Sequence, residues 1–272
     1  MKNHFKFLTM RKIISYIYII GVTLLMAACS NIDENERFIY VKPADVARCV
    51  LLEDYTGQMC VNCPKAVDVI NQIHEAYGDN VIAVGVHGGR LSLPSSSSPL
   101  GLATDEGNEY FNAAGHPNQP SGRVNRLGTP SNIDFWPSLV AEEIAKIAPL
   151  SIELATSYDE ATSTVTVDVK TMGTNGNTTG KLQLWLVEDN IVAPQFMPDG
   201  SRNLEYVHNH VLRGAVNGTW GEDFSVNEGE EKTVTRTATL KDHWKAEDMS
   251  VVAFVYNDNG VQQAAKIKIS VK

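Results

Sequence analysis

Two cysteines in the first half of the chain, Cys60 and Cys63, are separated by two residues. A C-x-x-C pair between a strand and a helix is typical of thiol–disulfide chemistry. The N-terminus of a helix stabilises an anion, so the pKa of the Cys60 thiol should be lowered, which makes Cys60 the nucleophile. Cys63 lies one turn later, within reach to resolve a mixed disulfide. The pair therefore predicts thiol–disulfide exchange.

Two other roles for this pair stay open. A static disulfide could brace the start of the helix, although so short a loop gains little from closure entropy. Metal binding needs more ligands than two thiolates, and the candidates Cys49, His87 and His116 match no zinc spacing. We predict no metal and no cofactor. Cys49 itself is expected to be a small buried apolar residue.

The elements that position the pair follow from hydrophobic periodicity. Val50-Leu51-Leu52 begins a buried strand, and apolar residues from Val61 to Tyr77 recur every three or four positions, as in a helix. A second β-rich run covers 81–86, and strand–helix–strand order implies a parallel pair with a right-handed crossover. Three further elements are expected: a helix at 105–114, a strand at 122–125 and a helix at 136–147.

The pattern changes near Ala148-Pro149 to one that alternates as strands do. Short β-rich runs separated by Gly, Asn and Asp clusters cover 151–158, 164–170, 181–188, 231–240, 251–256 and 264–271. Strands at this spacing favour a β-sandwich. We therefore predict an α/β domain at 46–149, followed by an all-β, immunoglobulin-like sandwich domain at 150–272.

The N-terminus has the parts of a secretory signal. Residues 1–28 carry four basic residues and no acidic ones, and an apolar run follows from Ile13 to Ala28. This run is short for a retained transmembrane helix of about 20 residues, which is the alternative. Cleavage after Ala28 lowers the net charge from −9 to −13, because four basic residues are lost. So acidic a chain argues against nucleic acid as a partner, since that binding depends on Lys and Arg.

The sequence Leu25-Met26-Ala27-Ala28-Cys29 resembles the bacterial lipobox. The resemblance implies that lipid is attached to Cys29, and two or three acyl chains anchor a protein firmly. Residues 29–45 then form a tether. Its acidic stretch at 31–36 is either a solvated spacer or similar to the stretch that follows the lipid cysteine in surface-exported Bacteroidetes lipoproteins.

The segment from Asp54 to Pro64 resembles the active site of thioredoxins. The resemblance implies that Asp54, six residues before Cys60, is a buried acid that assists proton transfer. It also implies a cis-proline loop facing the cysteines, for which Pro120 is our choice and Pro117 the alternative. The chain departs from thioredoxins at Met59, where they carry Trp, and at Pro64, since their proline lies between the cysteines.

A closer resemblance spans most of the mature chain. Residues 55–64, 120–126 and 206–213 are similar to the twenty-eight-kilodalton Porphyromonas outer-membrane lipoprotein and its Bacteroidetes relatives. The resemblance implies an outer-membrane lipoprotein, on the periplasmic or cell-surface face, with a thioredoxin-like part and a β-rich C-terminal part. It leaves two functions open: thiol–disulfide exchange on extracytoplasmic proteins, or non-catalytic binding of a surface partner, as in an adhesin. The sequence does not indicate an oligomeric state.

Other candidate features lie outside the cysteine segment. His208 and His210 would share a face if both lay on one strand, although nothing else completes a metal site. The loop at 91–104 is long, and loops of that length are often functional; it could control access to the cysteines. Five aromatic residues are expected either in the sandwich core or on a partner-binding face, namely Trp185, Phe196, Tyr206, Trp220 and Trp244.

Overall fold

The computed structural model describes residues 42–94 and 100–271, and residues 42–272 belong to one compact unit. The predicted leader at 1–28, the predicted lipidation site Cys29 and most of the predicted 29–45 tether lie outside the described residues. Among the described helices, none is long and apolar enough to cross a membrane.

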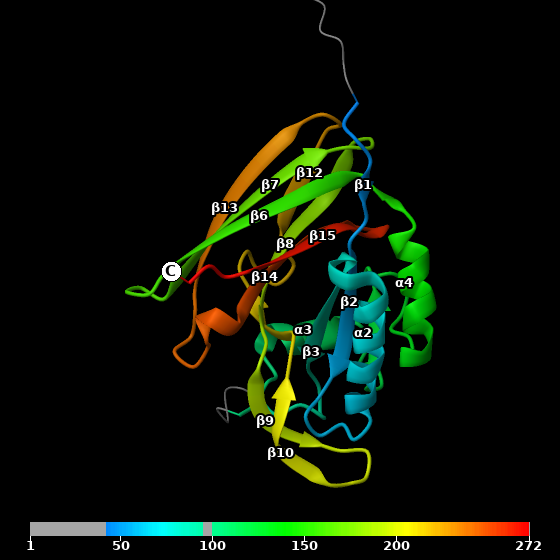
Figure 1. Cartoon of the computed structure of the whole chain (residues 1–272), viewed down its shortest axis with the longest axis vertical. Helices are drawn as coiled ribbons and strands as arrows, with labels where there is room; N and C mark the ends of the chain where they lie inside the picture. Colours follow the sequence, from blue (N-terminus) through cyan, green and yellow to red (C-terminus); the bar gives the residue numbers. More distant parts are fainter. Residues whose placement is uncertain (1–41, 95–99, 272) are drawn as a thin grey trace, which may run out of the picture. The chain divides into compact units, whose positions relative to one another are not determined.

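One eight-stranded sheet organises a mixed α/β structure (Figure 1). Its main path runs in the order β15 (Gly260–Lys268), β14 (Met249–Asn257), β8 (Thr178–Glu188), β11 (Val211–Ala215), β3 (Val81–His87), β2 (Val50–Thr56) and β4 (Ser121–Val124), and β12 (Glu222–Val226) also pairs with β8. β2 and β3 are parallel, as the strand–helix–strand pattern predicts, whereas β4 is antiparallel to β2.

Strand β11 connects the two halves of this sheet. It pairs in parallel with β3 and antiparallel with β8. Strands from both predicted domains, 46–149 and 150–272, therefore lie in one continuous sheet.

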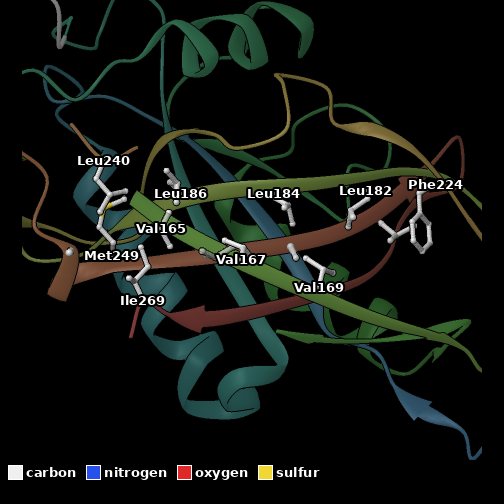
Figure 2. Close-up of a cluster of buried hydrophobic side chains, with 14 of the residues drawn as sticks. Val165, Val167, Val169, Leu182, Leu184, Leu186, Phe224, Leu240, Met249 and Ile269 are labelled. Atoms are coloured by element: carbon white, nitrogen blue, oxygen red, sulfur yellow. The ribbon is translucent and has the colours of Figure 1, made fainter. Parts of the chain in front are cut away.

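A second sheet covers one face of the C-terminal strands. It consists of β13 (Glu231–Thr239), β7 (Thr164–Gly173) and β6 (Leu150–Asp159), all antiparallel. Every second residue of β7 points inward, so Val165, Val167 and Val169 are fully buried against leucines of β8 (Figure 2). Burial of each such side chain contributes about 1.5–3 kcal/mol, so this interface is a main source of stability.

Helices cover both faces of the N-terminal strands. α2 (Cys63–Tyr77) and α4 (Trp136–Ile144) pack on one face, where Ile70 and Trp136 contact a core that includes Val50 and Leu52. α3 (Asp105–Ala113) packs on the opposite face through Tyr110 and Phe111. The remaining elements are β1 (Val46–Ala47), β5 (Ile147–Ala148), β9 (Ile191–Phe196), β10 (Arg202–His208) and the short 3-10 helices at 78–80, 133–135 and 246–248.

An arginine at the junction of the two halves is enclosed by aromatic rings. The Arg126 guanidinium carbon lies 4.5–5.8 Å from the centroids of five of them, which belong to Tyr110, Trp185, Trp220, Phe254 and Tyr256. Its Nε donates to Glu53 Oε1 at 2.8 Å, and both side chains are nearly buried. The charge of Arg126 is thus held by one carboxylate and several ring faces.

Most elements predicted from the sequence are confirmed. The structure has helices at 63–77, 105–113 and 136–144, and strands near all six β-rich runs of the second half. Four strands between 191 and 226 were missed. Of the five aromatic residues, Trp185 lies in the core, whereas Trp220 is 39% exposed.

Candidate functional site

Cys60 and Cys63 form a disulfide at the start of α2. Their Cα atoms are 5.4 Å apart, and Cys63 is the first residue of the helix. Pro64 follows in the first turn, where its missing N–H is not needed by the helix. The pair therefore lies between the end of β2 and the N-terminus of α2, which is the junction expected from the sequence.

Both cysteines are shielded from solvent. Cys60 is 3% exposed and Cys63 is 2% exposed, although Val61 between them is 40% exposed. A substrate sulfur therefore cannot reach either Sγ atom without movement of a neighbouring segment.

The β9–β10 hairpin provides much of this cover, and the sequence patterns do not predict it. Gln195 of β9 donates from Nε2 to the carbonyl of Cys60 at 2.9 Å, across 135 residues of sequence. The backbone N–H of Phe196 donates to the carbonyl of Gln58 at 2.8 Å. Figure 1 shows β9 and β10 as a two-stranded ribbon at the lower end of the view. The hairpin is thus hydrogen-bonded to the loop that carries the disulfide.

The long loop between β3 and α3 also touches this region. Gln58, buried next to the cysteine loop, donates to the carbonyl of Leu100 at 2.8 Å and accepts from the N–H of Leu102 at 3.0 Å. The N–H of Met59 donates to the carbonyl of Leu91 at 2.8 Å. The described parts of this loop therefore contact the residues just before Cys60.

Asp54 is the carboxyl group that accompanies the disulfide. It lies on β2, is 3% exposed, and lines the same cavity as Cys63. Its Oδ1 has no hydrogen-bond partner among the described residues. Burial penalises the charged carboxylate and raises the pKa of Asp54 to about 8. At neutral pH this carboxyl is therefore mostly protonated and can donate a proton.

Pro120 lies directly before β4, and the Gln119–Pro120 peptide bond is cis. Ser121 pairs with Tyr55 of β2, and Gln119 Nε2 donates to the carbonyl of Thr56. Pro120 lines a different cavity, formed by residues of 114–121 and 129–132 and by neither cysteine. The structure thus brings Asp54 and Cys63 to one cavity and leaves Pro120 outside it.

Two histidines that the sequence analysis did not connect lie in the Asp54 cavity. His87 ends β3, His208 ends β10, and their ring centroids are 5.7 Å apart. Burial lowers the pKa of His87 to about 3 and that of His208 to about 4, so both rings are neutral at pH 7. Only three-dimensional packing could reveal this pair, since 120 residues lie between the two histidines in the sequence.

His208 and His210 do not lie on one strand, so the condition for sharing a strand face is not met. β10 ends at His208, and His210 has a φ of 48°, which turns the chain between β10 and β11. His210 instead lies against His74, with ring centroids 6.3 Å apart. The two histidines therefore have different ring neighbours, although both line the cavity beside Cys63.

The three residues considered as further metal ligands do not converge. His87 is buried, His116 is exposed, and Cys49 is partly exposed in another cavity that it shares with His74. Burial raises the pKa of the Cys49 thiol to about 12, so it is protonated and unreactive. In the part of the chain that the structure describes, no group of three or more His, Cys, Asp or Glu could hold a metal ion.

Comparison with known proteins identifies a family and a fold. The family model described as "Outer membrane protein Omp28" matches residues 105–272. HBP35 of Porphyromonas gingivalis has a similar structure, with a TM-score of 0.66 and 18% identity over 84% of this chain and 77% of that one. At this identity the likeness shows a shared fold alone.

A domain of the outer membrane lipoprotein Omp28 from Porphyromonas gingivalis is closer in sequence. It is 32% identical over 46% of this chain and 91% of that one, with a TM-score of 0.34. No curated protein matches the chain.

Proposed function

The chain belongs to the Omp28 family of outer membrane proteins, and from this premise we propose that it catalyses thiol–disulfide exchange through Cys60 and Cys63. The family is one of outer membrane lipoproteins, so its substrates would be extracytoplasmic proteins. In this proposal Cys29 carries the lipid, residues 46–149 form a thioredoxin-like part, and residues 150–272 form an immunoglobulin-like sandwich.

The observation that carries the proposal is the position of Asp54. A buried carboxyl with a pKa of about 8 lines the same cavity as Cys63, one of the two disulfide-bonded cysteines. Such a group is costly to bury, and pKa values near the working pH are typical of general acids and bases. A disulfide that only braces a helix needs no proton donor beside it.

The reaction can be written from the disulfide form that the structure holds. A substrate thiolate attacks Cys60 Sγ and forms a mixed disulfide, while Cys63 leaves as a thiolate and takes the proton of Asp54. The second thiolate of the substrate then attacks the substrate sulfur of the mixed disulfide. A disulfide forms within the substrate, and Cys60 is released as a thiolate. Two electrons pass from the substrate dithiol to the protein pair, and the substrate keeps a disulfide. The reverse sequence oxidises the protein dithiol, with the Asp54 carboxylate as base.

Exchange in either direction requires the β9–β10 hairpin to move, because both cysteines are covered. The hydrogen bonds of Gln195 and Phe196 to the cysteine loop hold it closed. Each such bond contributes only about 1 kcal/mol net, so a closed hairpin can still open transiently. Access would then set the rate at which large substrates react.

Trapping of a mixed disulfide tests the proposed exchange. In Cys63→Ser, the Cys60 thiol freed from its disulfide should form a stable mixed disulfide with glutathione disulfide, whereas the Cys63 thiol of Cys60→Ser should react more slowly. Electrophoresis or mass spectrometry of the full chain measures both. If neither thiol reacts until the protein is unfolded, the exchange proposal fails.

Gln195→Ala in the Cys63→Ser background should make trapping severalfold faster, because the hairpin loses its bond to the Cys60 carbonyl. The matched control is Gln262→Ala, since Gln262 bonds within the β14–β15 hairpin and does not touch the cysteine loop. Equal rates with and without Gln195 would show that the hairpin does not limit access.

The burial of both cysteines favours a second candidate, a binding lipoprotein whose disulfide is static. The hairpin presents exposed apolar side chains to solvent, at Val192, Leu204 and Val207. Such residues suit recognition of a surface protein partner. A Cys60→Ser, Cys63→Ser double variant that keeps full biological activity would support this candidate over exchange.

A further inference from the structure

The cavity beside Cys63 holds more polar groups than exchange alone requires. Besides Asp54 it is lined by His87 and His208, which are 4% and 6% exposed. The Nδ1 atom of His87 and the Nε2 atom of His208 have no hydrogen-bond partner among the described residues, and neither has Asp54 Oδ1. Buried polar atoms in proteins are nearly always satisfied, so three of them around one cavity need a common explanation.

These groups come from three different strands. Asp54 lies on β2, His87 at the end of the neighbouring β3, and His208 at the end of β10 in the covering hairpin. The cavity measures about 30 Å³. A buried water needs at least about 10–15 Å³ and two to four polar partners, and this cavity offers both.

The same cavity leads away from the disulfide. Its walls also include Val207 and Asn209, both exposed on or just after β10. Tyr206 also lines the cavity, and its ring centroid lies 4.8 Å from that of His208. A continuous lining thus runs from Asp54, past His208, to the surface of the hairpin.

We propose that Asp54, His87 and His208 hold one water molecule and form a proton path from the protein surface to Cys63. This inference rests on the proposed exchange function. When Cys63 leaves as a thiolate, it takes one proton from Asp54. The water then passes a proton to the Asp54 carboxylate and is itself reprotonated from solvent, while the free Nε2 of His208 holds it in place, so one proton enters for each Cys63 thiol formed. The reverse reaction exports the same proton.

The surroundings suit such a path. His87 faces His208, with Arg213 and His210 also near, and these positive or polar neighbours add to burial in keeping the imidazole neutral. A neutral imidazole accepts a hydrogen bond at its unprotonated nitrogen, so the free nitrogen of each ring can hold the water.

Replacement of His208 tests the path through the kinetics of reduction. In His208→Phe, the rate at which dithiothreitol reduces the disulfide should fall about tenfold at pH 7, with a larger solvent deuterium isotope effect. His208→Gln, whose amide can still bond the water, should stay within about threefold of the wild type. The control His243→Phe changes an exposed histidine and should have no effect.

A titration of the oxidised protein separates this inference from the exchange function. The carboxyl stretch of Asp54, followed by infrared spectroscopy against pH, should show a higher pKa in His208→Phe than in the wild type, because the carboxylate loses a hydrogen-bonded water. This readout needs no turnover. An unchanged Asp54 pKa, or equal reduction rates in His208→Phe and the wild type, would overturn the path. A wild-type disulfide that never exchanges would instead defeat the proposed function.

Discussion

Replacing Asp54 by Asn should slow reduction of the Cys60–Cys63 disulfide by about a hundredfold at pH 7. A positioned general acid contributes typically about 10²–10⁴ in rate, and Asp54 is the ionisable carboxyl that lines the Cys63 cavity. Without it, the Cys63 thiolate must leave unprotonated into a buried environment that disfavours its charge. Stopped-flow measurement of reduction by dithiothreitol gives the rate directly.

The pH dependence of this variant distinguishes acid catalysis from damage to the fold. The folded pKa of Asp54, about 8, lies above its ordinary value of 3.8. Between these values the folded protein holds a proton that the unfolded chain has lost, so wild-type stability falls as pH rises from about 4 to about 8. The slope is at most about 1.4 kcal/mol per pH unit. Asn cannot ionise, so Asp54→Asn should become increasingly more stable than the wild type across this window.

Two results together would support the role of Asp54: slower reduction and higher stability above pH 4. The control Asp68→Asn, at an exposed position of α2, should change neither. If the disulfide of Asp54→Asn is reduced as fast as that of the wild type, Asp54 does not supply the proton. The main support for the exchange function is then lost.

Replacing Arg126 by Met should lower the free energy of unfolding by about 3–5 kcal/mol. The variant leaves Glu53, which is 1% exposed, buried without its charged partner. It also removes the cation from a cage of five rings that belong to α3, β8, β14 and the loop before β12. Urea denaturation of the oxidised protein measures the loss.

A double-mutant cycle gives the physical cause of that loss. Removal of both charges in Arg126→Met with Glu53→Gln should restore part of the stability, because no uncompensated buried charge remains. The control Arg236→Met breaks an ion pair with Glu222 that is partly exposed, and it should cost less than about 1 kcal/mol. A loss for Arg126→Met no greater than for Arg236→Met would contradict the account of the cage.

The local structure around the cysteines could be predicted because it depends on short-range signals. The apolar spacing in α2 and the β-rich runs before and after it predicted the parallel pair β2 and β3, which the structure has in register from Val50 to Thr56. The site residues are likewise close in sequence, because Asp54 on β2 and the Cys60–Cys63 pair lie within ten residues. Period and spacing carry such information over one or two elements.

The cover over the disulfide could not be predicted, because it comes from distant sequence. β9 contains Pro194, which argues against a strand in any single-sequence reading, and β10 has few buried residues to give an alternating pattern. Gln195, His87 and His208 meet the cysteine segment only through tertiary packing. The joining of both halves in one sheet also depends on residues that are distant in sequence. β11 pairs with β3 through one residue pair, Val211 with Gly85.

The central claim is that the Cys60–Cys63 disulfide exchanges electrons with substrates, and its reduction potential is the most direct test. Equilibration of the full chain with glutathione redox buffers, followed by thiol alkylation and mass spectrometry, gives this value. We expect a potential between about −270 and −120 mV, the range of thiol–disulfide oxidoreductases. A potential below about −300 mV, as in structural disulfides of secreted proteins, would contradict the exchange function and leave the binding lipoprotein as the better account.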